Sequence, residues 1–117
     1  MTINEIKELL DAEVLCCEEN TNKAVYSACG CDLMSDVLAY VKDQAVLLTG
    51  LVNPQVVRTA VMMDMVCIVF VRSKSPSEEM LKLAEDNGIV ILGTEKRLYE
   101  ACGILYSSGL IGEAYKA

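Results

Sequence analysis

The sequence predicts an α/β fold, a three-layer α/β/α domain with a mostly parallel sheet of about five strands. Two observations lead to this prediction. Short apolar runs alternate with segments of helical periodicity through most of the chain, as expected for strands joined by crossover helices. In addition, the run CIVFV at residues 67–71 is apolar at every position, which is typical of a strand covered on both faces. We therefore expect this run to lie at the centre of the sheet.

The first part of the chain predicts one helix and two strands. A short helix is indicated by apolar residues at helical spacing: Ile3, Ile6, Leu9 and Leu10. The runs EVLC (13–16) and AVYSA (24–28) predict strands on either side of a turn at ENTN (19–22). Because this connection is short, we expect the two strands to pair antiparallel at an edge of the sheet.

The middle of the chain predicts a helix, a strand and a second helix. The first helix is indicated by an apolar stripe: Met34, Val37, Leu38 and Val41. The run AVLL (45–48) predicts the strand. Asn53 is expected to cap the second helix, with Pro54 at its first position, because proline has no N–H to satisfy there.

After the central run the pattern predicts a helix, a strand and a final helix. The string SPSE (75–78) predicts a capping box with Ser75 as the N-cap, and Asn87-Gly88 predicts a left-handed helix end. IVIL (89–92) predicts the strand, and Gly93-Thr94 is expected to turn and to cap the final helix. That helix has an apolar stripe at Leu98, Ala101, Cys102 and Leu105.

Size and charge restrict the function. The 117 residues suit a single domain over 1–117, and the 53% hydrophobic content is sufficient for a core. A net charge of −7 disfavours binding to nucleic acid or anionic lipid, which needs clustered cations. The N-terminus lacks the apolar stretch of a signal peptide, and no apolar run approaches the roughly 20 residues of a membrane span. We expect a soluble, cytoplasmic protein.

A candidate ligand site lies where the predicted parallel strands end. Loops at 28–32, 49–53, 72–75 and 93–94 should meet at one edge of the sheet, where α/β domains bind ligands. Arg72 and Lys74 favour a small anionic or nucleotide ligand there. The same residue types also form ordinary caps and turns. The candidate ligand-binding residues are Gly30, Asp32, Thr49, Gly50, Asn53, Ser73, Ser75 and Thr94.

The six cysteines are expected to be reduced, with Cys67 acting as a core residue. Cys29 and Cys31 flank Gly30, a pattern that we interpret as a tight turn and not as a metal site, because strong zinc motifs pair such elements. Cys16 and Cys17 could bring two more thiols near through strand pairing. No metal or cofactor is expected.

The sequence contains few of the patterns that catalysis requires. Asp32 and Asp36 could share a helix face and hold Mg²⁺ or transfer protons, but acidic residues in a first helical turn are also explained by the helix dipole. The chain has no histidine, and none of its seven glycines is followed by lysine. His-activated nucleophiles and a P-loop are therefore excluded, and no catalytic residue is expected.

Several strings between Val25 and Leu110 resemble a known family. They are CDLMSDVLAY, TGLVNPQVVRTA, IVFV followed by PSEEMLKLAEDNGI, and YEACGILY. Together they resemble stand-alone DRTGG-domain proteins, relatives of the N-terminal domain of HPr kinase/phosphorylase. The resemblance implies a three-layer α/β domain of a kind that occurs beside CBS domains in some pyrophosphatases and has no established catalytic residue. The Asp-Arg-Thr-Gly-Gly string itself is absent, and the expected equivalent loop, Gly50 to Pro54, lacks the Asp-Arg pair. Functions that depend on this pair do not carry over.

These observations favour a non-catalytic regulatory or protein-interaction module that self-associates, as a dimer, and senses a small ligand at the carboxyl edge. The run VMMDM (61–65) and a mean hydropathy of +0.34 indicate an interface, or alternatively a methionine-filled core. The alternative function is a small thiol-based redox or metal-handling protein that uses Cys29 and Cys31.

Overall fold

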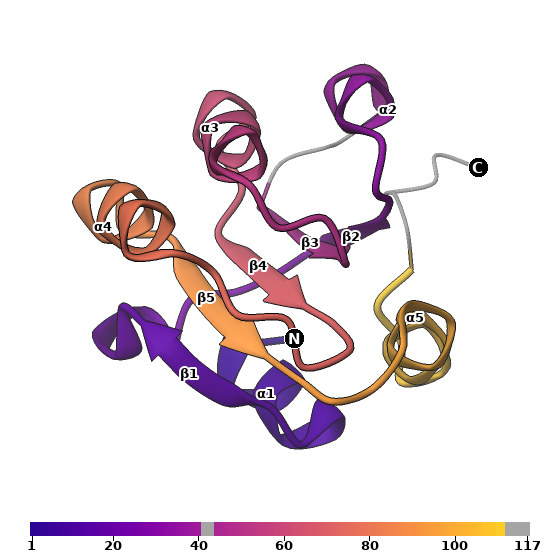
Figure 1. Cartoon of the computed structure of the whole chain (residues 1–117). Coiled ribbons are helices and arrows are strands. Elements are labelled where there is room, and N and C mark those ends of the chain that lie inside the picture. The colour runs from indigo at the N-terminus through magenta and orange to yellow at the C-terminus, as the bar shows by residue number, and fades with distance from the viewer. Residues whose placement is uncertain (41–43, 112–117) are drawn as a thin grey trace.

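The computed structural model describes residues 1–40 and 44–111, which contain a five-stranded sheet in the order β1-β5-β4-β3-β2 (Figure 1). Strands β2 to β5 pair in parallel, and β1 pairs antiparallel with β5. The mostly parallel α/β prediction is therefore confirmed. The strands are β1 Glu13–Cys16, β2 Ser27–Gly30, β3 Ala45–Thr49, β4 Cys67–Phe70 and β5 Val90–Gly93.

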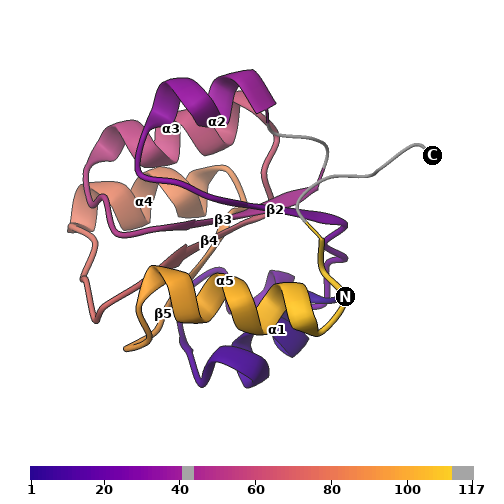
Figure 2. The ribbon, with the colours of Figure 1, turned by 90° about the vertical axis from the view of Figure 1, so that its right-hand side faces the viewer.

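Helices cover both faces of the sheet. Helices α1 and α5 lie on one face, and α2, α3 and α4 lie on the other (Figures 1 and 2). The helices are α1 Ile3–Leu10, α2 Met34–Tyr40, α3 Pro54–Met62, α4 Glu78–Asp86 and α5 Leu98–Ser107, with a short 3-10 helix η1 at Glu18–Asn20. Among the described residues, no helix combines the length and apolar character that a membrane span requires.

Strand β4 is at the centre of the sheet, as predicted, and all four of its side chains are buried. Cys67 and Val69 pack toward α1 and α5, whereas Ile68 and Phe70 pack toward α3 and α4. Each fully buried aliphatic or aromatic side chain of this kind contributes about 1.5–3 kcal/mol relative to exposure. A continuously apolar strand is thus the expected sequence for this position.

The predicted pairing of the first two strands is wrong, because β1 and β2 lie at opposite edges of the sheet. After β1, Cys17 adopts a left-handed φ of 60° and η1 follows, so the chain turns away from β1. The second strand begins at Ser27, three residues later than predicted, and Ala24 instead forms an isolated bridge with Thr2.

Local signals for helix starts are correct at α3 and displaced at α4. The Asn53 side chain accepts a hydrogen bond from the Val56 N–H (3.3 Å), and Pro54 is the first residue of α3. Helix α4, however, is capped by Ser77, whose hydroxyl accepts from the Met80 N–H (3.3 Å). Ser75 therefore is not the cap. A residue before proline is restricted to extended backbone, and the start at Glu78 places two acids in the first turn, where the helix dipole favours them.

Two other predicted roles are corrected. Thr94 does not cap α5, because its hydroxyl donates to the carbonyl oxygen of Leu10 (2.8 Å) and so joins the end of β5 to α1. Leu38 lies on the exposed side of α2, although Met34 and Val37 are buried as predicted. Val41 lies outside the described residues.

Candidate ligand site at the carboxyl edge of the sheet

The four predicted loops meet at one edge of the sheet because β2, β3, β4 and β5 all run in the same direction. Strand β1 runs the other way, so its first residue, Glu13, lies beside Gly93 at that same edge. The edge is therefore built from the ends of four strands and the start of a fifth. This is the position at which open α/β sheets bind ligands.

Asp32 joins the loops that follow β2 and β3. One of its carboxylate oxygens accepts hydrogen bonds from the Gly50 N–H and from the Thr49 hydroxyl, both at 2.8 Å. These two bonds, with a smaller contribution from Arg72, hold the pKa of the Asp32 carboxyl below its usual value. Asp32 precedes α2 and is not paired with Asp36 on a helix face, which corrects that alternative.

Arg72 and Ser73 form a left-handed turn at the end of β4, with φ values of 59° and 58°. The Arg72 N–H donates to the carbonyl oxygen of Lys96 (2.8 Å), and the Ser73 N–H donates to that of Thr94 (3.0 Å). Two consecutive residues other than glycine in this conformation cost about 1–3 kcal/mol each, and such strain clusters at functional sites. The β4 and β5 loops are thus locked together.

The guanidinium group of Arg72 lies directly over Gly50. A Cβ at position 50 would be 2.6 Å from its Nη2 atom, so only glycine leaves room for this arrangement. In the part of the chain that the structure describes, the cations of four ion pairs are Lys7, Arg58, Lys82 and Lys96, and Arg72 is not one of them. Its side chain is exposed to solvent, where its N–H groups can bind an anion.

The loops that follow β4 and β5 contain several cations. Arg72, Lys74, Lys96 and Arg97 are four of the ten lysines and arginines in the chain. Helix α5 begins directly after Arg97, and within the described structure no side chain caps its first N–H groups. Leu98, at the start of α5, is next to Gly30. The uncapped amino end of α5 therefore adds a partial positive charge to the same edge.

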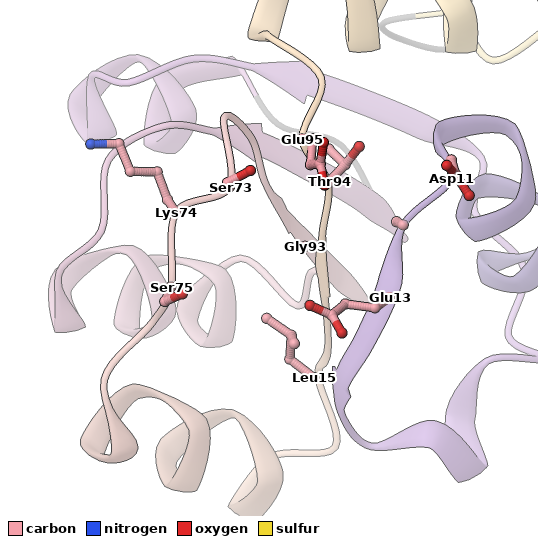
Figure 3. A pocket seen from close by; sticks show the side chains of 10 residues that line it. Asp11, Glu13, Leu15, Ser73, Lys74, Ser75, Gly93, Thr94 and Glu95 are labelled. Atoms are coloured by element: carbon pink, nitrogen blue, oxygen red, sulfur yellow. The ribbon is translucent and has the colours of Figure 1, made fainter.

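A cavity of about 440 Å³ lies on the other half of the edge, between the β4 and β5 loops and the start of β1 (Figure 3). Its lining is Asp11, Ala12, Glu13, Leu15, Ser73, Lys74, Ser75, Gly93, Thr94 and Glu95. The lining contains three carboxylates and one ammonium group, and Figure 3 shows the Lys74 side chain directed away from Glu13 and Leu15. This charge disfavours a polyphosphate inside the cavity.

The structure divides the predicted site residues into two groups. Asp32, Thr49 and Gly50 lie near the Arg72 turn, whereas Ser73, Ser75 and Thr94 line the cavity. Gly30 belongs to neither group, because it lies against Cys102 and Leu98 of α5. Asn53 caps α3. Sequence reasoning missed Asp11, Glu13 and Glu95, because only the antiparallel direction of β1 brings the first two here. Sequence reasoning also missed Arg97, although Lys96 and Arg97, two adjacent cations directly before a predicted helix, could have indicated it.

The cysteines do not gather at one site. Cys16 and Cys17 are at the β1 side, and Cys29 and Cys31 are at the opposite edge, so the four-thiol arrangement that strand pairing could have produced does not form. Burial raises the pKa of Cys29 to about 11. The Cys31 sulfur accepts a hydrogen bond from the Leu33 N–H (3.2 Å) in the predicted turn. A protonated Cys29 is a poor nucleophile and a poor metal ligand.

A comparison of the sequence with protein-family profiles identifies the family of this chain. The family profile of the DRTGG domain matches residues 5–108, nearly the whole chain. The chain belongs to the DRTGG-domain family. The resemblance in its sequence strings is therefore confirmed, although the loop from Gly50 to Pro54 lacks the Asp-Arg pair for which DRTGG domains are named. A comparison with curated proteins gave no significant match.

A solved structure shares the DRTGG fold. It contains the CBS and DRTGG domains of the regulatory region of Clostridium perfringens pyrophosphatase, complexed with the activator diadenosine tetraphosphate. The TM-score is 0.72 with 16% sequence identity, and the match covers 92% of this chain and 46% of that one. At this identity the similarity establishes the fold, and the chain spans about half the length of the pyrophosphatase fragment.

Proposed function

We propose that this DRTGG domain is a non-catalytic regulatory module that binds a small phosphate-bearing ligand, such as a nucleotide, at the carboxyl edge of its sheet. The observation that supports this most strongly is the position of Arg72. Its backbone is fixed by a strained turn, and its guanidinium group lies over Gly50 and near Asp32, at the loops that follow β2 and β3. Backbone strain does not stabilise the fold, and such strain clusters at functional sites.

The local charge supports an anion. The chain has a net charge of −7, yet four of its ten cations lie on the two loops next to this turn. Arginine can bind a phosphate through two parallel N–H groups, and the uncapped amino end of α5 favours negative charge. We place the phosphate between Arg72 and the first turn of α5. The acidic cavity next to it would accept the uncharged part of the ligand.

The nucleotide class is supported by the DRTGG-containing pyrophosphatase region, which was crystallised with diadenosine tetraphosphate as its activator. The absence of histidine and the raised pKa of Cys29 support a role without catalysis. The pKa of Asp32 is lowered by the bonds from Thr49 and Gly50, so its carboxylate is a weak base, and we assign it a role in positioning the loops.

The experiment is isothermal titration calorimetry with diadenosine tetraphosphate, ADP and inorganic pyrophosphate, and with adenosine as the uncharged control. We expect the phosphate compounds to bind and adenosine to bind at least tenfold more weakly. The variant Arg72→Gly removes the guanidinium and suits the left-handed backbone, so it should fold and should weaken phosphate binding at least tenfold.

The matched control is Arg58→Gly in the interior of α3, outside the four edge loops, where an exposed arginine pairs with Glu79 (3.8 Å). Because glycine destabilises a helix interior, binding is compared at temperatures where each variant is fully folded. Equal losses of binding in the two variants, or no binding of any phosphate compound at millimolar concentration, would contradict the proposal.

A further inference from the structure

The acidic cavity at the carboxyl edge of the sheet offers hydrogen-bond acceptors that no protein group uses. Its lining includes the carboxylates of Asp11, Glu13 and Glu95. Within the described structure, the Glu13 side chain makes no ion pair or hydrogen bond, and the same is true of the hydroxyl groups of Ser73 and Ser75. An ionised carboxylate can only accept hydrogen bonds. The group that occupies this cavity must therefore donate them.

Glu13 is the acidic residue that the fold places over the floor of the cavity. It pairs with Gly93 in the antiparallel register of β1 and β5, and glycine has no side chain to fill the space above this pair. Leu15, two residues later on β1, lies against the same space, because a Cβ at position 93 would be 3.2 Å from its Cδ1 atom. Figure 3 shows the side chains of Glu13 and Leu15 extending over β5. A carboxylate and an apolar side chain thus line one side of the cavity, which suits a sugar ring with hydroxyl groups at its rim and C–H groups on its face.

The chemistry of the lining favours a sugar over a metal ion or an amine. Among the residues that the structure describes, no three acidic or thiol side chains are arranged to hold a metal ion. An ammonium group would gain little from exposed carboxylates, since the attraction between exposed charges in water is weak. Two hydroxyl groups on adjacent carbon atoms, however, can donate to the two oxygens of one carboxylate. Acidic residues recognise ribose hydroxyl groups in this way in other α/β folds.

The distance from this cavity to the arginine site restricts the length of the ligand. Gly50, under the guanidinium group of Arg72, directly follows the last residue of β3. Four residues lie in one row across the sheet because each pairs with the next: Thr49, Phe70, Gly93 and Glu13. This row spans three strand spacings, about 14 Å. A nucleoside monophosphate is too short for this distance, whereas a nucleoside with an extended chain of three or more phosphates, hydrogen-bonded at both ends, is long enough.

We propose that the acidic cavity is a ribose subsite, in which Glu13 accepts hydrogen bonds from the 2′ and 3′ hydroxyl groups of a nucleoside polyphosphate whose terminal phosphate lies at Arg72. This inference rests on the proposed function, because it names the ligand class of the same site. The carboxylates of the cavity repel the phosphate chain and so fix the direction in which the ligand lies across the edge. Glu13 thereby determines a preference for ribose over a sugar without these hydroxyl groups.

The test is isothermal titration calorimetry of the full chain with ATP, 2′,3′-dideoxy-ATP and inorganic triphosphate. We expect the wild type to bind ATP about tenfold or more tightly than dideoxy-ATP, because two hydrogen bonds to a charged group are lost. Glu13→Ala should bind the two nucleotides equally. It should bind inorganic triphosphate at least as tightly as the wild type does, which also shows that the variant is folded and that its phosphate site is intact.

Glu85→Ala is the matched control, because it removes one exposed carboxylate from α4, outside the lining of the cavity. This variant should keep the wild-type preference for ATP. Equal binding of the two nucleotides by the wild type, an unchanged preference in Glu13→Ala, or an equal loss of preference in Glu85→Ala would each overturn the ribose subsite and leave the phosphate site standing. If neither ATP nor inorganic triphosphate binds, the proposed function fails and this inference fails with it.

Discussion

Replacing Gly30 by alanine places a methyl group where the thiol of Cys102 lies. Gly30 ends β2, and a Cβ built on it would overlap the Sγ atom of Cys102 on α5 and would be 3.8 Å from a methyl group of Leu98. Gly30 is not among the glycines with positive φ, so alanine is compatible with its backbone. The cost of the substitution therefore comes from lack of space and not from strained dihedral angles.

The expected loss can be estimated from two opposing effects. Forcing a methyl group into occupied space typically costs about 1–3 kcal/mol, while replacing glycine by alanine restricts the unfolded chain and returns about 0.4–1 kcal/mol. Cys102 is partly buried and can rotate about one bond, which favours the lower end of the first range. A cost of about 1–2 kcal/mol less this return means that Gly30→Ala should lower the free energy of unfolding by about 0.5–1.5 kcal/mol.

The assay is urea unfolding followed by circular dichroism in the presence of reductant. The double variant Gly30→Ala/Cys102→Ala lacks the Sγ atom, so it should be more stable than Gly30→Ala alone, with a coupling energy of about 1 kcal/mol. Gly103→Ala is the control, because its Cβ meets no atom, and it should gain about 0.5–1 kcal/mol. A Gly30→Ala variant as stable as the wild type, or no recovery in the double variant, would refute the reasoning.

Three further predictions follow from single side chains. The hydroxyl of Thr59 is buried without a hydrogen-bond partner in the described structure, so Thr59→Val should raise the free energy of unfolding by about 1 kcal/mol, and a loss would contradict this. Because the pKa of Asp32 is lowered in the folded protein, its carboxylate stabilises the fold at pH values above the usual pKa of an aspartate side chain, about 3.9. That contribution is lost as the pH falls through the folded pKa, and Asp32→Asn should weaken this dependence in acid unfolding. Cys29, with a pKa of about 11, should react slowly with iodoacetamide at pH 7 and faster toward pH 11, and Cys67 should react only after unfolding. Fast labelling of Cys29 at neutral pH would instead favour the thiol-based alternative.

The sequence was sufficient wherever a few neighbouring residues decide the outcome. The buried strand β4 could be predicted because five consecutive apolar residues leave no polar face. The start of α3 could be predicted because Asn53 and Pro54 each satisfy a local requirement of a helix amino end. Parallel strands place their carboxyl ends at one edge of the sheet, so the prediction that the loops containing Asp32 and Thr49 meet there was correct.

The predictions that were wrong or missing depend on contacts between residues that are far apart in the sequence. Nothing within residues 13–16 specifies that β1 pairs with β5, about 75 residues later, and that pairing brings Asp11 and Glu13 to the cavity. The position of Arg72 over Gly50 likewise depends on a left-handed turn fixed by Lys96. The site was therefore predictable as a location, but its charges and its division into two halves were not.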